Sequence, residues 1–82
     1  MNYRIGEKVK VINVRGPLRM QEIVLHKTAK ITKVRYFNPD NIELSLLFDE
    51  PFLCNNTKDY FMQTQACKAE QVIKVNTLIK IL

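Results

Sequence analysis

The 82-residue sequence has no long apolar run. A membrane helix needs about 18 consecutive apolar residues, and no stretch approaches that length. Residues 1–10 carry charges where a signal peptide would need an apolar segment. We therefore expect a cytoplasmic protein without a membrane partner, in which Cys54 and Cys67 are reduced thiols.

Histidine and cysteine are also scarce, which argues against a metal site or a catalytic centre. His26 is the only imidazole, and twelve residues separate Cys54 from Cys67 without any Cys-x-x-Cys pair. A cysteine nucleophile with His26 as its base would lack an identifiable third residue to orient it. We expect no metal, no cofactor and no enzymatic activity, and we interpret Cys67 as a small buried hydrophobe.

Glycine is limited to Gly6 and Gly16, and no repeat, low-complexity tract or flexible linker divides the chain. Hydrophobic residues make up 46% of the sequence, which is enough for one modest core. Residues 1–82 are therefore expected to form a single domain.

The apolar pattern of the first half predicts two strands. Residues 8–14 have strong strand propensity and stop at the following Gly-Pro pair. Residues 18–26 suit either a helical turn or a long loop folded over the mouth of a barrel. In residues 28–37, the apolar residues Ala29 and Ile31 stand at odd positions, whereas Val34 and Tyr36 stand at even positions. Such a change of phase inside one strand requires a bulge or a sharp bend.

The second half begins with the clearest structural signal, a turn at residues 38–41 followed by residues 42–49, in which Ile42, Leu44, Leu46 and Phe48 alternate with the other positions. The Glu50-Pro51 pair is expected to end this strand and to open a loop over residues 52–58. A short strand at 60–64, one helical turn within 65–71 and strand segments at 72–75 and 78–82 complete the prediction. The fold class is all-β, a barrel of five or six short strands.

Five segments occur in an order that resembles SH3-like barrels of the KOW and Tudor type: Gly6–Val11, Ala29–Val34, Ile42–Asp49, Tyr60-Phe61 and Ile73–Val75. The resemblance implies a small SH3-like barrel with one short helical turn. It also implies a binding function, because SH3-like barrels bind peptides, modified side chains, DNA and RNA.

Charge is divided unevenly along the chain. Residues 1–35 carry nine Lys or Arg against two acids, residues 36–70 carry two against six, and residues 71–82 add two lysines. A basic half of this kind indicates a nucleic acid or another anionic partner, such as an acidic protein surface. The alternative is a solvated surface that keeps a small protein soluble.

A stripe of cations on the first two strands would bind phosphates in a salt-dependent and largely sequence-independent way. Tyr3, Tyr36 and Phe37 could stack on bases, or the last two could instead cap the core at the end of the hairpin. The candidate nucleic-acid-binding residues are Lys8, Lys10, Arg15, Arg19, Lys27, Lys30, Lys33, Arg35 and Tyr36.

The alternative function is a small protein-interaction module, including a phage or mobile-element product that modulates a host protein complex. Its candidate residues are acidic and apolar: Asp49, Glu50, Phe52, Leu53 and Tyr60. The competing interpretation is that Phe52 and Leu53 simply cover one end of the barrel. The apolar residues 78–82 could finish the barrel or pair with a second copy as the edge of a homodimer.

Overall fold

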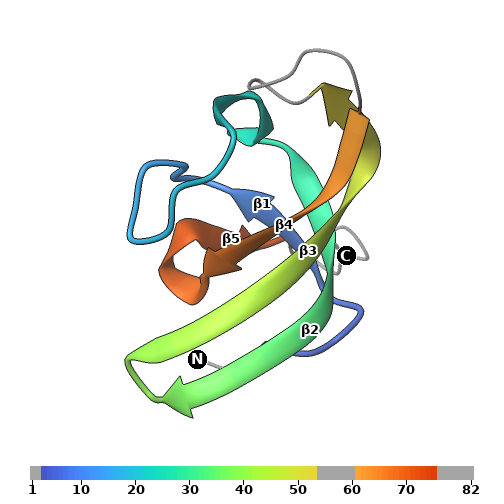
Figure 1. Cartoon of the computed structure of the whole chain (residues 1–82). Helices are drawn as coiled ribbons and strands as arrows, with labels where there is room; N and C mark the ends of the chain where they lie inside the picture. The colour runs from blue at the N-terminus through green and yellow to red at the C-terminus, as the bar shows by residue number, and fades with distance from the viewer. Residues whose placement is uncertain (1–2, 54–60, 76–82) are drawn as a thin grey trace, which may run out of the picture.

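The computed structural model describes residues 3–53 and 61–75, and it contains one antiparallel sheet in the order β4-β3-β2-β1-β5 (Figure 1). The two outer strands of the sheet are therefore β4 and β5. The elements are β1 (Lys8–Val11), η1 (Glu22–Val24), β2 (Thr28–Asn38), β3 (Asn41–Leu53), β4 (Phe61–Lys68), η2 (Ala69–Gln71) and β5 (Val72–Lys74).

The mainly β class that the sequence predicts is confirmed, and the curled five-stranded sheet is compatible with a small barrel. Over the described ranges, the only helical segments are the short 3-10 turns η1 and η2. None of these residues forms a helix that is long and apolar enough to span a membrane.

The core is formed by the inward-facing residues of the alternating strands. On β3, Ile42, Leu44, Leu46 and Phe48 are buried, while the residues between them are at least partly exposed. Strands β1 and β2 add further buried residues to the same cluster, including Val9, Val11, Ala29 and Ile31. Burial at every second residue is what one buried face of a sheet requires. The antiparallel pairing of β2 with β3 on either side of residues 38–41 confirms the predicted hairpin.

A bulge in β2 explains the change of phase that the sequence shows. Ile31 is paired with Leu46, but the next paired residue is Lys33, opposite Ser45. Thr32 is thus the extra residue, and its hydroxyl donates a hydrogen bond to the carbonyl of Ser45 over 3.3 Å. The predicted bulge is confirmed, and residues 33–36 of β2 lie on the opposite face from the one that simple alternation would give.

Strand β3 is longer than expected, because Glu50-Pro51 does not end it. The strand continues to Leu53, and Phe52 pairs with Met62 of β4 after an irregularity that begins at Leu47. Proline lacks an N–H group and is tolerated in a strand at such an irregularity. Phe52 is buried and packs edge-on against Phe48, with ring centroids 5.4 Å apart. Burial of this aromatic ring favours continued pairing over a loop.

The connection between β1 and β2, residues 12–27, is a long loop that contains η1. It is held to the rest of the molecule by hydrogen bonds from the Leu18 N–H group to Gln71 Oε1 and from the Gln21 N–H group to Gln65 Oε1. The loop therefore lies against η2 and β4, which fits the predicted loop folded over the barrel.

The last elements differ in length from the prediction. β4 runs to Lys68, so the predicted helical turn within residues 65–71 is reduced to the three residues of η2. The predicted strand at 72–75 is present as β5. Tyr60, Cys54 and the strand expected at residues 78–82 lie outside the described residues.

Candidate functional site

The register of the sheet gathers the predicted cations of β1 and β2 on one surface. Lys8 lies directly opposite Lys30, and Lys10 lies opposite Thr28. These residues alternate with buried ones, so their side chains point away from the core. We call this surface the outer face. Its cationic residues are Lys8, Lys10, Lys30, Lys33 and Arg35.

The bulge at Thr32 determines which residues of β2 reach the outer face. Without it, Lys30 would share a face with Thr32 and Val34. With it, Lys33 and Arg35 follow Lys30 on that face, because they pair with Ser45 and Glu43, the outward residues of β3. The irregularity in β2 thus creates a continuous row of cations along the strand.

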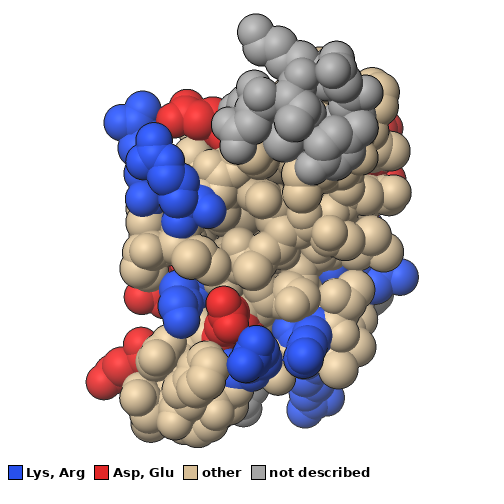
Figure 2. All heavy atoms as spheres, viewed as in Figure 1, with Lys and Arg blue, Asp and Glu red and all other residues tan. Residues whose placement is uncertain are grey.

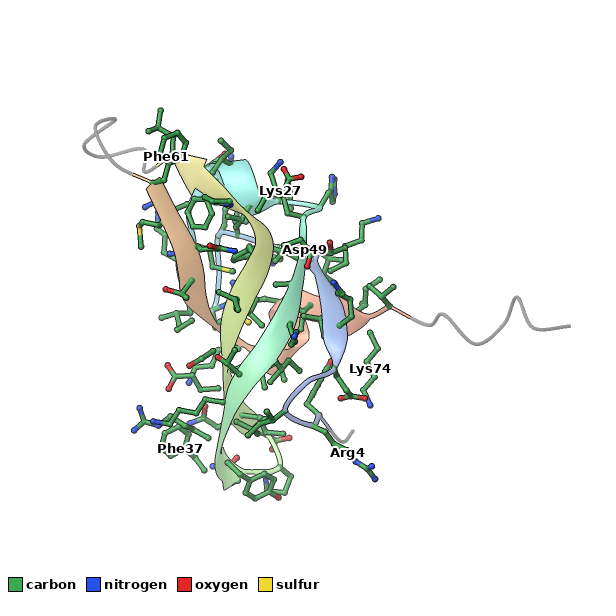
Figure 3. The ribbon with its side chains drawn as sticks, turned by 90° about the vertical axis from the view of Figure 1, so that its right-hand side faces the viewer. Arg4, Lys27, Phe37, Asp49, Phe61 and Lys74 are labelled. Carbon is green, nitrogen blue, oxygen red and sulfur yellow. The ribbon has the colours of Figure 1, made fainter. Side chains whose placement is uncertain are left out.

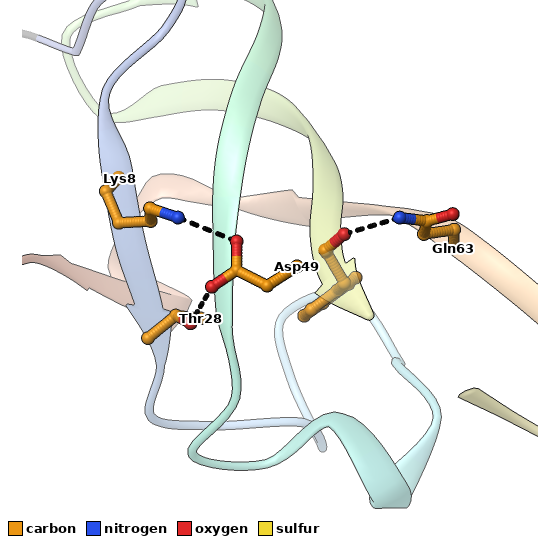
Figure 4. Close-up of polar contacts among 5 residues, drawn as sticks. Lys8, Thr28, Asp49 and Gln63 are labelled. Atoms are coloured by element: carbon orange, nitrogen blue, oxygen red, sulfur yellow. Dashed lines mark hydrogen bonds and ion pairs between the residues drawn. The ribbon is translucent and has the colours of Figure 1, made fainter. Parts of the chain in front are cut away.

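Asp49 reduces the repulsion at the centre of this face. Lys8 Nζ donates to Asp49 Oδ1 over 2.7 Å, and the Thr28 hydroxyl donates to Asp49 Oδ2 (Figure 4). These two hydrogen bonds, with the nearby charge of Lys30, hold the pKa of the Asp49 carboxyl below its ordinary value. The like charges of Lys8 and Lys30, which face each other across the strands, are destabilising alone. The carboxylate of Asp49 offsets that effect.

Three cations of the outer face have no carboxylate partner among residues 3–53 and 61–75. Among the described residues, Lys10, Lys30 and Lys33 form no ion pair within 4.0 Å, and all three are exposed. By contrast, Arg35 lies 3.8 Å from a carboxylate oxygen of Glu43. The unpaired ammonium groups are therefore available to an anionic ligand.

The β2–β3 hairpin carries an exposed aromatic ring beside the row of cations. Phe37 falls at a second register shift, between Tyr36 and Asn38. The Arg35 guanidinium carbon lies 5.6 Å from the centroid of the Phe37 ring, and Lys68 Nζ lies 5.5 Å from that centroid. Tyr36 and Phe37 are 65% and 53% exposed, so neither caps the core, contrary to that alternative. Tyr36 pairs with the buried Ile42, so the structure places it on the opposite face of the sheet from Lys33 and Arg35, and Phe37 is the ring that lies beside the cations.

The remaining predicted cations lie elsewhere or at the margin. Arg15 is in the loop after β1, 3.6 Å from a carboxylate oxygen of Glu22, and Arg19 follows on the same loop. Because that loop is bound to η2 and β4, the structure does not bring these two residues to the outer face. Lys27 immediately precedes β2, and its carbonyl accepts a hydrogen bond from the Val11 N–H group. It lies at the end of the outer face.

Charge alone does not delimit the site. In the view of Figure 2, Lys and Arg side chains form one group at the upper left and another along the lower part, and acidic side chains lie beside both. Cations are thus spread over more than one side of the molecule. What distinguishes the outer face is the register that lines up five of them on neighbouring strands.

The residues predicted for a protein partner that the structure describes, a set without Tyr60, are not gathered into an exposed rim. Phe52 is only 3% exposed, as expected of a residue that covers one end of the barrel, and Leu53 is half-buried. Asp49 belongs to the outer face through its bonds to Lys8 and Thr28. Glu50 is exposed.

Cys67 has the properties of a structural residue. It is fully buried in the core cluster. Burial, with smaller contributions from the charges of Glu43 and Glu70, raises the pKa of its thiol to about 12. The group therefore stays protonated at neutral pH and is a poor nucleophile. Its interpretation as a small buried hydrophobe is confirmed.

Sequence reasoning missed two contributors to the outer face. Lys68 pairs with Glu43 across β3 and β4 and reaches Phe37, although it is distant in sequence from the basic half of the chain. Thr28 orients Asp49. The only sequence signal that bears on these two residues is the alternation in β3, and it does not reveal which residues of the other strands lie opposite that strand.

No protein family model, curated protein or solved structure matches the chain.

Proposed function

We propose that this protein is a non-catalytic nucleic-acid-binding domain that holds a phosphate backbone on its outer face. The observation that carries the proposal is the bulge at Thr32, which aligns Lys30, Lys33 and Arg35 beside the lysines of β1. A relation to SH3-like barrels of the KOW and Tudor type would fit this function. It does not establish the function, since such folds bind several classes of ligand.

The spacing of the cations suits a polyanion. Outward-facing residues of one strand repeat at roughly 6.6 Å, and neighbouring strands lie roughly 4.8 Å apart. Ammonium groups on flexible stems at these intervals can contact several phosphates of one strand without reading bases. The expected binding is therefore non-specific or weakly specific in sequence, and driven largely by the release of counterions.

The number of available cations sets the expected salt dependence. Within the part of the chain that the structure describes, Lys10, Lys30 and Lys33 form no ion pair, while Lys8 and Arg35 have carboxylate partners. Three to five phosphate contacts would give a slope of roughly −2 to −4.5 for the logarithm of the association constant against the logarithm of salt concentration. A slope near zero would contradict the proposal.

A pair of charge-reversal variants tests the site. Lys30→Glu with Lys33→Glu removes two unpaired cations from the outer face. Arg15→Glu with Arg19→Glu makes the same change in net charge on the loop. Fluorescence anisotropy with labelled oligothymidylate, oligouridylate and duplex DNA should show at least a roughly tenfold loss for the first variant and a much smaller loss for the second. Equal losses would show that total charge, rather than the outer face, determines binding.

A further inference from the structure

A groove of about 650 Å³ lies between the tip of the β2–β3 hairpin and the segment formed by η2 and β5. Its apolar walls include Ile12, Ile42, Val72 and Ile73. Ile12 and Ile73 are 44% and 48% exposed, so these aliphatic side chains are in contact with water. A hollow that combines this volume with exposed aliphatic side chains is typical of a binding site.

The walls of the groove are tied together by hydrogen bonds. The Tyr3 hydroxyl lies 3.4 Å from the carbonyl oxygens of both Ala69 and Val72, and joins the N-terminal segment to η2 and β5. Lys68 Nζ donates to Asn41 Oδ1 over 2.8 Å, which ties the residue before η2 to the hairpin turn. A site with fixed walls loses little conformational freedom when a ligand binds.

The charges beside the groove favour a cation. Asp40 of the hairpin turn and Glu70 of η2 both line it. Neither forms an ion pair within 4.0 Å with any residue in the described ranges. Lys74 also lines the groove, but its ammonium lies 3.3 Å from a Glu7 carboxylate oxygen and 5.3 Å from the centroid of the Tyr3 ring. The lysine is therefore engaged, whereas the two carboxylates have no ion-pair partner within the described part of the chain.

We infer that this groove docks an extended segment of a partner protein that presents aliphatic side chains next to a lysine or arginine. The aliphatic side chains would displace water from Ile12 and Ile73, and the basic residue would lie between Asp40 and Glu70. A nucleic acid does not fit these walls, because the free charges are negative. The groove meets the outer face at β5, where Ile73 pairs with Lys10, and the carboxylates Asp40 and Glu70 allow the groove to be tested separately.

The test is selection of a random peptide library displayed on phage against the immobilised full chain. Enriched peptides should share two or more aliphatic residues next to Lys or Arg. A synthetic peptide of the enriched sequence should then shift the NMR amide signals of Ile12 and Ile73. Its affinity should fall about tenfold with Ile12→Thr and Ile73→Thr together, and about fivefold with Asp40→Asn and Glu70→Gln together.

Matched controls separate this site from the outer face and from misfolding. Lys30→Glu with Lys33→Glu should leave peptide affinity unchanged, whereas Ile12→Thr alone should leave oligonucleotide affinity unchanged. The carboxylate variants change no apolar contact, so they report on the groove even if the isoleucine variants unfold. Enrichment of acidic peptides, no enrichment over the bare support, or equal binding to all variants would overturn the inference. A concentration-dependent dimer that Ile73→Thr converts to a monomer would identify a second copy as the occupant and overturn it as well.

Discussion

The side chain of Gln71 exchanges two hydrogen bonds with the backbone of Leu18, 53 residues away in sequence. Its Nε2 donates to the carbonyl oxygen of Leu18 over 2.6 Å and to that of Asn13 over 3.0 Å. Its Oε1 accepts from the N–H groups of Leu18 and Lys68. Gln71 is fully buried, and this single amide satisfies four backbone groups that join the first loop to η2.

Replacing Gln71 should therefore destabilise the fold strongly. Gln71→Leu leaves the carbonyls of Asn13 and Leu18 without their donor, and each buried unsatisfied group costs about 1–3 kcal/mol. We expect a loss of about 2–4 kcal/mol in the free energy of unfolding, measured by urea denaturation. The matched control is Gln63→Leu, which removes one hydrogen bond to the Phe48 carbonyl from an exposed position and should cost about 1 kcal/mol or less. Equal losses would contradict this role for Gln71.

The parts of the fold that the sequence predicted are those encoded by neighbouring residues. The alternation from Ile42 to Phe48 and the turn before it depend on side-chain parity and local turn chemistry, and so does the bulge in β2. The extension of β3 past Pro51 depends instead on burial of Phe52 against Phe48, a contact that no local pattern reports. In the sequence, Gln71 cannot be distinguished from any other polar residue of a helical turn, because its hydrogen-bond partners Asn13 and Leu18 belong to a distant loop.

The same distinction applies to the candidate site. The basic character of the first two strands was evident, but the register that places Lys8 opposite Lys30 comes from pairing between strands. Arg15 and Arg19 were grouped with these lysines by proximity in sequence, whereas the loop that carries them is bound to η2 and β4. Asp49 was assigned to a different surface because its bond to Lys8 spans 41 positions.

The acid stability of the protein should depend on Asp49. Its pKa is lowered, first by the hydrogen bond from Lys8 and then by that from Thr28. A carboxyl whose pKa is lower in the folded state stabilises the fold above its ordinary pKa, and this contribution disappears as the pH falls through the folded value. An NMR titration should find the pKa of Asp49 below the ordinary aspartate value and closer to it in Lys8→Met. The variant Asp49→Asn should show a weaker decline of stability in acid.

Thr28→Val provides a second test of the same group. It removes one hydrogen bond to Asp49 without changing any charge, so the pKa should rise by less than in Lys8→Met. An Asp49 pKa at its ordinary value in the unmodified protein would contradict this view of the outer face.

Phe52→Ala should unfold or nearly unfold the protein. Phe52 is buried against Phe48, and removing a buried aromatic ring costs about 3–5 kcal/mol. The net stability of a domain of this size is only roughly 5 kcal/mol. Phe61→Ala is the control, since that ring is 67% exposed and its removal should change stability by about 0.5 kcal/mol or less. Thermal and urea denaturation distinguish the two variants. A folded, stable Phe52→Ala protein would contradict the core position of this residue.

The exposed ring of Phe37, beside the cations of the hairpin, predicts a preference for single-stranded nucleic acid. Bases of a single strand can stack on an aromatic side chain, while those of a duplex stack on one another. The chain contains no tryptophan, so Phe37→Trp introduces a single fluorophore beside Arg35 and Lys68. Its emission should be quenched by oligothymidylate and much less by a duplex of equal length. Phe37→Leu should weaken single-strand binding by about 1–3 kcal/mol and leave duplex binding nearly unchanged.

The control for this prediction is Phe61→Trp. Phe61 is also exposed but lies at the opposite end of the molecule from Phe37 (Figure 3). Its fluorescence should not respond to oligothymidylate if the strand follows the outer face towards the hairpin. Quenching at both positions would indicate binding without a fixed path. Quenching at Phe61 alone would show that the strand runs elsewhere, because only Phe37 has the cations of β2 and β4 beside its ring.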